Sequence, residues 1–150
     1  MKRIVFIDAR NATRSQIAEA WFNHLAKDCG QAQSCGAMPA NRVDVRAIKV
    51  MREVGLEIHT RAPKPINQQL LANADLVVLM GRDVRPYAFQ SAQIWDFRDL
   101  DGEPIEAVRD LRDKIRSRVQ KLIAEIRMEE FETITTPTAW REMMLCLAAV

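Results

Sequence analysis

Residues 4–15 read Ile4-Val5-Phe6-Ile7-Asp8-Ala9-Arg10-Asn11-Ala12-Thr13-Arg14-Ser15. The first four residues are apolar and mostly aromatic or β-branched, which favours a buried parallel strand over 4–7. From residue 14 onward apolar residues recur at helical spacing, so we predict a helix over 14–28. The residues between are therefore a strand-to-helix turn. The first N–H groups of the helix have no partner within it and point at whatever the turn holds.

Such a turn is suited to a tetrahedral oxyanion. Helix N-termini bind phosphate readily, and the planar guanidinium of Arg14 can donate to two of its oxygens. We therefore predict a phosphate-binding loop made of Ala9, Arg10, Asn11, Ala12, Thr13, Arg14 and Ser15. On these residues alone, an equally weighted alternative is that Arg14 is an ordinary surface residue and Asp8 an ordinary acid at a strand end.

Strands and helices are expected to alternate along the chain. We predict strands over 4–7, 31–35, 76–80 and 93–96, and helices over 14–28, 43–54, 67–73 and 103–129. Gly30 and Gly55 are expected to end two of the helices. This order indicates an α/β fold: a single three-layer domain with a central parallel four-stranded sheet and helices on both faces. Ligands of such sheets bind at the carboxyl ends of the strands, where Asp8 lies.

Composition is typical of one domain with a sizeable core, at 150 residues and 48% hydrophobic. The net charge of +2 gives no sign of nucleic-acid binding. No segment has the continuous apolar length of a membrane helix, and Met1 leads directly into a strand rather than a signal peptide. We therefore expect no membrane contact and a cytoplasmic location.

The cysteines and histidines show no metal or disulfide pattern. Cys29, Cys35 and Cys146 form no CxxC motif, so we expect reduced, structural thiols. His24 and His59 have no nearby ligand partners in the sequence. We expect no metal and no cofactor. The charges of residues 109–118 alternate at helical spacing, which is typical of a solvated helix face.

Several segments resemble the low-molecular-weight protein tyrosine phosphatases and the related arsenate reductases. Residues 8–15 are similar to their C-x-x-N-x-x-R-S loop, with Asp8 at the position of the cysteine. Collinear similarity extends over roughly residues 3–126, through Ser34-Cys35-Gly36, 47–58, Pro63-Lys64-Pro65, 74–81, 95–102 and 109–123. The resemblance implies the fold of that family for residues 1–130. It leaves residues 131–150 as a C-terminal extension with an apolar segment.

The resemblance also implies roles for individual residues. In the family a cysteine thiolate attacks phosphorus, the loop amides and arginine hold the oxyanion, and a later aspartate protonates the leaving oxygen. The corresponding catalytic positions are Asp8, Arg14 and Asp99. Because the proline that usually follows the acid is Leu100 here, Asp96 and Asp101 are alternatives for Asp99.

Arsenate reduction by the family route is not expected. After Met80-Gly81 the thioredoxin-coupled arsenate reductases carry a cysteine pair, whereas this chain reads Arg82-Asp83-Val84-Arg85-Pro86.

Asp8 changes what the loop can do. Carboxylates attack phosphorus in enzymes that form an aspartyl phosphate, but these generally use Mg²⁺ held by a second carboxylate. Two residues after Asp8, where that carboxylate is usual, stands Arg10. Two like charges about 4 Å apart repel by about 4 kcal/mol at an effective dielectric near 20. We expect the Asp8 carboxylate to fill the loop partly as a built-in anion, with its pKa lowered by Arg14 and the helix N-terminus, so that oxyanions bind weakly.

These features predict a pseudophosphatase that acts by binding a phosphoprotein or another protein partner. The alternative is an active phosphohydrolase on phosphotyrosine or small phosphate esters, which uses Asp8 or a water that it activates. A third interpretation is that Asp8 is an engineered replacement in an ordinary phosphatase. The further departures at Thr13, where the family loop usually has glycine, at Leu100 and at residues 82–85 argue against it.

The C-terminal extension suggests a contact surface. The last predicted helix ends near Met128, residues 129–138 are polar and contain Pro137, and residues 140–150 are apolar. An apolar segment of this kind is normally covered. We expect it to pack first on its own domain, next on a second copy in a homodimer, and then on a partner peptide.

Overall fold

The central sheet has four parallel strands in the order β2-β1-β3-β4. The computed structural model describes residues 1–84, 91–135, 138, 141 and 145. The strands are β1 (Lys2–Asp8), β2 (Gly30–Gly36), β3 (Leu76–Leu79) and β4 (Gln93–Ile94). The predicted four-stranded parallel sheet is confirmed. β1 is longer and β4 shorter than predicted.

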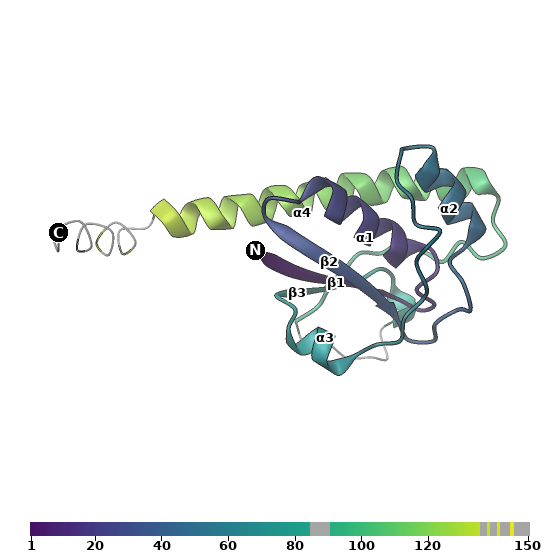
Figure 1. Cartoon of the computed structure of the whole chain (residues 1–150), viewed down its shortest axis with the longest axis horizontal. Coiled ribbons are helices and arrows are strands. Elements are labelled where there is room, and N and C mark those ends of the chain that lie inside the picture. The colour runs from purple at the N-terminus through teal and green to yellow at the C-terminus, as the bar shows by residue number, and fades with distance from the viewer. Residues whose placement is uncertain (85–90, 136–137, 139–140, 142–144, 146–150) are drawn as a thin grey trace.

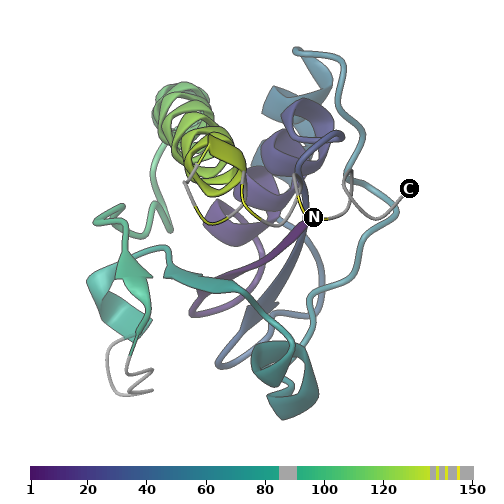
Figure 2. The ribbon, with the colours of Figure 1, turned by 90° about the vertical axis from the view of Figure 1, so that its left-hand side faces the viewer.

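The helices lie on both faces of the sheet. They are α1 (Arg14–Leu25), α2 (Val45–Arg52), α3 (Gln68–Ala72) and α4 (Ile105–Thr135), with a short 3₁₀ helix, η1 (Arg82–Val84). Figures 1 and 2 show α1, α2 and α4 together on one side of the sheet and α3 on the other. The predicted three-layer α/β architecture is therefore confirmed.

β1 lies at the centre because its side chains are apolar on both faces. Ile4 and Phe6 belong to the larger core, which is shared with α1, α2 and α4. Val5 and Ile7 belong to a second core, against which α3 packs. This alternation follows from the two-residue period of a strand. It brings the end of β1, and the loop that follows, between the two layers.

Of the two glycines that were predicted to end helices, Gly55 does so and Gly30 does not. α1 ends at Leu25 rather than residue 28, and the N–H of Ala26 donates to Phe22 O. Gly30 therefore ends no helix. It is the first residue of β2, where an added Cβ would lie 2.9 Å from ring carbons of Phe22, so its role is close packing. Gly55 does follow α2, with φ +79, in the left-handed conformation that glycine adopts without strain.

α4 was predicted to end near Met128 but continues to Thr135. Neither glycine nor proline interrupts residues 105–136, so nothing in the local sequence stops the helix there. Its buried residues extend only from Val108 to Ile126, and Figure 1 shows its last turns projecting beyond the sheet. Most of the predicted apolar tail, including Trp140 and Cys146, lies outside the described residues. Within the described ranges, no helix combines the length and apolar character needed to cross a membrane.

Candidate functional site

The loop between β1 and α1 is shaped by the side chain of Asn11. This residue has φ +51, a left-handed conformation that asparagine tolerates better than most residues. Its amide nitrogen donates to the hydroxyl oxygens of Ser15 (2.8 Å) and Ser34 (2.9 Å). Its amide oxygen accepts from the N–H of Lys64 (2.9 Å). Asn11, which the sequence indicated, therefore connects α1, β2 and the segment before α3.

A second layer of polar contacts supports the loop, and sequence reasoning missed it. Ser34 donates to Glu19 Oε2 (2.5 Å), and Glu19 forms an ion pair with Arg61 (3.1 Å). Gln16 Nε2 donates to the main-chain and side-chain oxygens of Asn11, both at 3.1 Å. Glu19 and Arg61 are far apart in the sequence, so no spacing motif joins them. In the sequence, the only local indication of these contacts was the polar residue Gln16 directly after Ser15.

The backbone of residues 36–40 also contacts the loop closely. Met38 N–H donates to Ala9 O (2.7 Å) and Ala40 N–H to Arg10 O (2.9 Å). At Gly36 an added Cβ would lie 2.7 Å from the nitrogen of Asn11, so this approach requires glycine.

Asp8 occupies the inside of the loop. Its side chain is only 2% exposed, Oδ1 accepts from the N–H of Asn11 (2.5 Å), and Oδ2 accepts from the N–H of Ser15 (2.9 Å). The carboxylate thus satisfies two loop amides, as expected for a built-in anion. The expected lowering of its pKa is wrong. Burial raises the pKa of Asp8, because the cost of desolvating the charge outweighs the amide bonds and the attraction of Arg14.

Arg14 is held by a partner that the sequence did not identify. Its guanidinium is buried and forms a two-bond pair with Asp83 of η1, from Nη1 to Oδ1 (2.9 Å) and from Nη2 to Oδ2 (2.6 Å). Nη1 also donates to Phe97 O (2.8 Å). The hydrogen bond with Arg14 lowers the pKa of Asp83. Within the described residues Arg14 makes no hydrogen bond to Asp8, so its attraction to Asp8 acts through space.

The candidate acids divide into two groups. Asp99 and Asp101 form ion pairs with Arg10, at 3.7 and 3.3 Å, and so lie beside the loop. Asp96 instead pairs with Arg82 at 2.8 Å. The structure therefore brings Asp99 and Asp101, but not Asp96, into contact with a loop residue.

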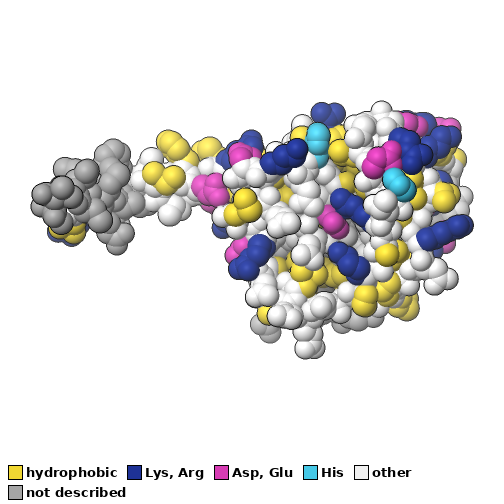
Figure 3. Space-filling model, in the orientation of Figure 1, with side chains coloured by type: hydrophobic (Ala, Val, Ile, Leu, Met, Phe, Trp, Pro, Cys, Tyr) yellow, Lys and Arg dark blue, Asp and Glu magenta, His cyan; other side chains and the backbone are white. Residues whose placement is uncertain are grey.

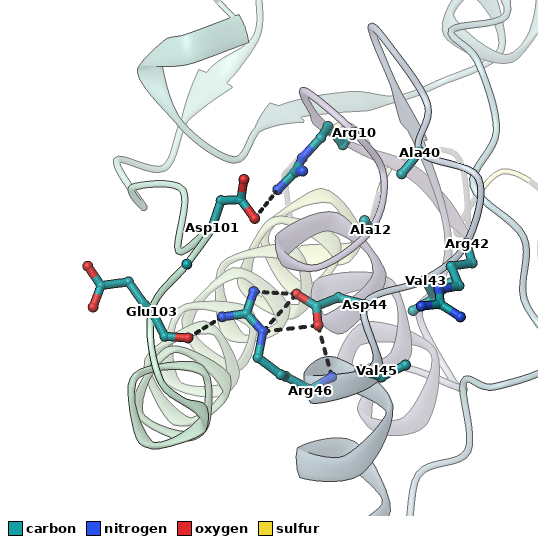
Figure 4. Close-up of a pocket in the computed structure, with 11 residues that line it drawn as sticks. Arg10, Ala12, Ala40, Arg42, Val43, Asp44, Val45, Arg46, Asp101 and Glu103 are labelled. Atoms are coloured by element: carbon teal, nitrogen blue, oxygen red, sulfur yellow. Dashed lines mark hydrogen bonds and ion pairs between the residues drawn. The ribbon is translucent and has the colours of Figure 1, made fainter.

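A cavity of about 520 Å³ opens beside the loop. Figure 4 shows Arg46 crossing it, from Asp44 to the segment that contains Glu103. Arg46 donates to Asp44 Oδ2 (2.5 Å), to Leu100 O (2.9 Å) and to Glu103 O. These bonds tie the start of α2 to the segment that carries the candidate acids. The lining consists of Arg10, Ala12, Ala40, Arg42, Val43, Asp44, Val45, Arg46, Asp101, Gly102 and Glu103.

Several backbone donors of the loop remain unused. Across the described part of the chain, the N–H groups of Ala9, Arg10, Ala12, Thr13 and Arg14 donate to no protein acceptor. Consecutive N–H groups of this kind form an anion-binding concavity. The loop thus contains two sets of amides: two that Asp8 satisfies and five that an oxyanion could satisfy.

The two cysteines and two histidines that the structure describes take no part in this site. Cys29 and Cys35 are buried and form no disulfide; burial raises the pKa of Cys29, and raises that of Cys35 to about 12. Cys146 lies outside the described residues. His24 packs against Trp21, and His59 contacts Glu57. Among the residues described, no group of three or more His, Cys, Asp or Glu side chains is arranged to hold a metal ion.

Comparisons with known proteins agree with one another. The family model described as low molecular weight phosphotyrosine protein phosphatase matches residues 3–132. A glutaredoxin arsenate reductase of Synechocystis sp. is 34% identical over 131 residues, which cover 84% of this chain and 99% of that protein. The structure of an arsenate reductase in the phosphate binding state has a TM-score of 0.74 at 32% identity and covers 84% of this chain and 99% of that chain. The YwlE arginine phosphatase from Geobacillus stearothermophilus has a TM-score of 0.78, covers 88% of this chain and 97% of its own, and at 23% identity shows a shared fold.

Proposed function

The chain belongs to the low molecular weight phosphotyrosine protein phosphatase family, and we propose that it is a pseudophosphatase that works by binding rather than by catalysis. The observation that carries this proposal is the position of Asp8. Its carboxylate lies buried within the loop, at the position that resemblance assigns to the nucleophilic cysteine, with both oxygens bonded to loop amides.

Asp8 is a poor substitute for a thiolate. An ionised carboxylate repels a phosphate dianion, by about 4 kcal/mol per pair of unit charges at 4 Å and an effective dielectric near 20. In enzymes that form an aspartyl phosphate a metal ion offsets this repulsion. The residue that usually supplies the second carboxylate is Arg10 here, and Arg10 pairs with Asp99 and Asp101.

The other two catalytic positions are also engaged within the protein. Arg14 is paired with Asp83, and Asp99 is paired with Arg10. The buried guanidinium of Arg14 therefore already has a partner without a ligand, whereas the pair of Arg10 with Asp99 is partly exposed. We expect weak oxyanion binding at neutral pH, through the five unused amides of Ala9, Arg10, Ala12, Thr13 and Arg14. The relative described in a phosphate binding state supports an oxyanion as the ligand class.

Arsenate reduction, which the names of several relatives describe, is not proposed for this chain. Asp8 replaces the thiol in the loop, and residues 82–86 contain no cysteine. The raised pKa values of Cys29 and Cys35 disfavour the thiolate forms that redox chemistry needs.

The partner that we propose is a protein. Met128, Phe131 and Ile134 expose their side chains on the projecting part of α4 and offer a contact surface for a second copy of the chain. A phosphoprotein partner at the loop stays a prediction, as does the cytoplasmic location.

The alternative is a phosphohydrolase in which Asp8 acts as nucleophile or activates a water. The raised pKa of Asp8 favours it, because a general base works best when its pKa is near the working pH. The deep burial of the carboxylate opposes it.

Hydrolysis of para-nitrophenyl phosphate separates the two functions. We expect the native chain to be inert with and without Mg²⁺, and Asp8→Cys to gain turnover, because the supports of the loop remain in place. Asp8→Ala is the matched control and should be inert in either case. Turnover by the native chain that is lost in Asp8→Ala would show that Asp8 is catalytic and would overturn the pseudophosphatase proposal.

A further inference from the structure

We propose that Asp8 is a proton-controlled gate of the loop: its carboxylate excludes oxyanions, and its protonated form admits them to the unused amides. This inference rests on the proposed function, because it concerns the same loop as a binding site without catalysis. It adds a condition, the protonation of Asp8, under which the loop binds an oxyanion.

The geometry places the gate and the ligand site next to each other. Asp8 accepts from the N–H groups of Asn11 and Ser15. The unused donors lie on the same turn, at Ala9 and Arg10 before Asn11 and at Ala12, Thr13 and Arg14 between Asn11 and Ser15. An oxyanion on the unused donors therefore lies close to the Asp8 carboxyl. At about 4 Å and an effective dielectric near 20, the repulsion of two unit charges weakens binding roughly a thousandfold.

Protonation removes that repulsion and adds a donor. A neutral carboxyl carries an O–H group that can donate to an oxyanion oxygen, whereas the carboxylate only accepts. The burial of Asp8, which raises its pKa, means that the change happens at a higher pH than for an exposed aspartate.

The other charged and titratable groups near Asp8 keep their charge state while Asp8 is protonated, or are held in ion pairs. Arg14 on α1 stays cationic throughout the acidic range, because its bonds to Asp83 raise its pKa further, and Lys64 before α3 also faces Asp8 and Cys35. Cys35 on β2 has a pKa of about 12 and stays neutral, and Asp83 on η1 stays ionised because its bond to Arg14 lowers its pKa. The remaining carboxylates near the loop are each held in an ion pair: Glu19 with Arg61, and Asp99 and Asp101 with Arg10.

Sulfate is the probe for the experiment, because it remains a dianion from weakly acidic to neutral pH while phosphate does not. Calorimetric titrations compare the full native chain with Asp8→Asn, a neutral variant of similar shape, in weakly acidic and in neutral buffer. We expect native affinity to rise at least tenfold on acidification. Asp8→Asn should bind sulfate at both pH values with similar affinity. Asp110→Asn, which neutralises an exposed carboxylate of α4 that pairs with Lys114, is the matched control and should keep the pH dependence of the native chain.

The native chain by itself provides a second test if Asp8→Asn does not fold. The midpoint of the change in sulfate affinity must match the midpoint of the Asp8 carboxyl titration followed by carbon-13 NMR. Different midpoints would overturn the gate. So would equal sulfate affinity of the native chain and Asp8→Asn at neutral pH, or no binding by folded Asp8→Asn at either pH. These outcomes leave the hydrolysis assay unaffected, so the gate and the pseudophosphatase proposal fail separately.

Discussion

At the scale of the residue, Asp8 shows that burial can outweigh favourable partners. Two loop amides and the nearby Arg14 all stabilise the carboxylate, and from them the sequence predicts a lowered pKa. The side chain is almost completely removed from water, however, and desolvation has the larger effect. Asp8 therefore accepts hydrogen bonds from two loop amides, and yet the folded state disfavours its ionised form.

This ionisation predicts how stability depends on pH. Between the unfolded pKa of about 3.9 and the raised folded pKa, the folded chain binds more protons at Asp8 than the unfolded chain. The stabilisation from Asp8 is fully present below the unfolded pKa and is lost as pH rises through the folded pKa. The free energy of unfolding of Asp8→Asn, relative to the native chain, should therefore rise with pH in that window, by up to about 1.4 kcal/mol per pH unit.

Urea unfolding of both chains at several pH values measures this difference. The contributions of the other carboxylates cancel, because both chains contain them. Asp8→Ala should give the same slope, because it also lacks the titrating group. A difference that does not change with pH would contradict the raised pKa of Asp8.

At the scale of the element, α1 protects the free edge of the sheet. β2 is an edge strand, and its outward-facing backbone groups at Ala32 are both bonded by the side chain of Asn23. Nδ2 donates to Ala32 O (3.0 Å), and Oδ1 accepts from Ala32 N–H (2.7 Å). Further along β2, Gly36 N–H donates to Lys64 O (2.8 Å). Covered backbone groups cannot pair with another chain, which is how proteins limit association at sheet edges.

Removing the Asn23 side chain should therefore destabilise the fold. We expect Asn23→Ala to lower the free energy of unfolding by about 1–3 kcal/mol, since it leaves a donor and an acceptor of a buried residue without their partners. Gln33→Ala is the matched control on the same strand: its side chain is exposed, and we expect a change within about 0.5 kcal/mol. Urea unfolding measures both, and equal effects would contradict the role given to Asn23.

At the scale of the whole molecule, the end of α4 is an exposed helix with an apolar surface. After Ile126 the described part of α4 has no buried residue, and Phe131 and Ile134 are 62% and 71% exposed. Figure 3 shows apolar side chains on this projecting part. Most of the stability of a helix in a protein comes from packing, which the described turns of α4 after Ile126 lack. A second copy of the chain that packs on Phe131 and Ile134 would supply it.

Shortening the chain tests this contact. We expect the full chain to self-associate, and a chain ending at Glu130 to be a folded monomer, because the buried residues of α4 end at Ile126. Full-length Phe131→Ser/Ile134→Ser is the matched variant and should also be monomeric. Light scattering after gel filtration, over a range of concentrations, measures the oligomeric state. A full chain that remains monomeric would contradict the homodimer.

The residues alone predicted the strand-to-helix turn and the layered α/β fold, because hydrophobic periodicity and turn residues are local features of a sequence. The roles of Asn11 and Ser15 in the loop were implied by the family resemblance. The helix ends were less accurate, because tertiary packing selects where a helix stops: α1 ends early where Gly30 must pack on Phe22.

The tertiary structure alone decided how the site is arranged. The pairing of Arg14 with Asp83 joins residues 69 positions apart, and the pairing of Arg10 with Asp99 joins residues that are even farther apart in the sequence. The sign of the Asp8 pKa shift depends on how much water the surrounding layers exclude. Contacts between distant segments and the desolvation of a charge both arise only once the chain has folded, so no short stretch of sequence contains them.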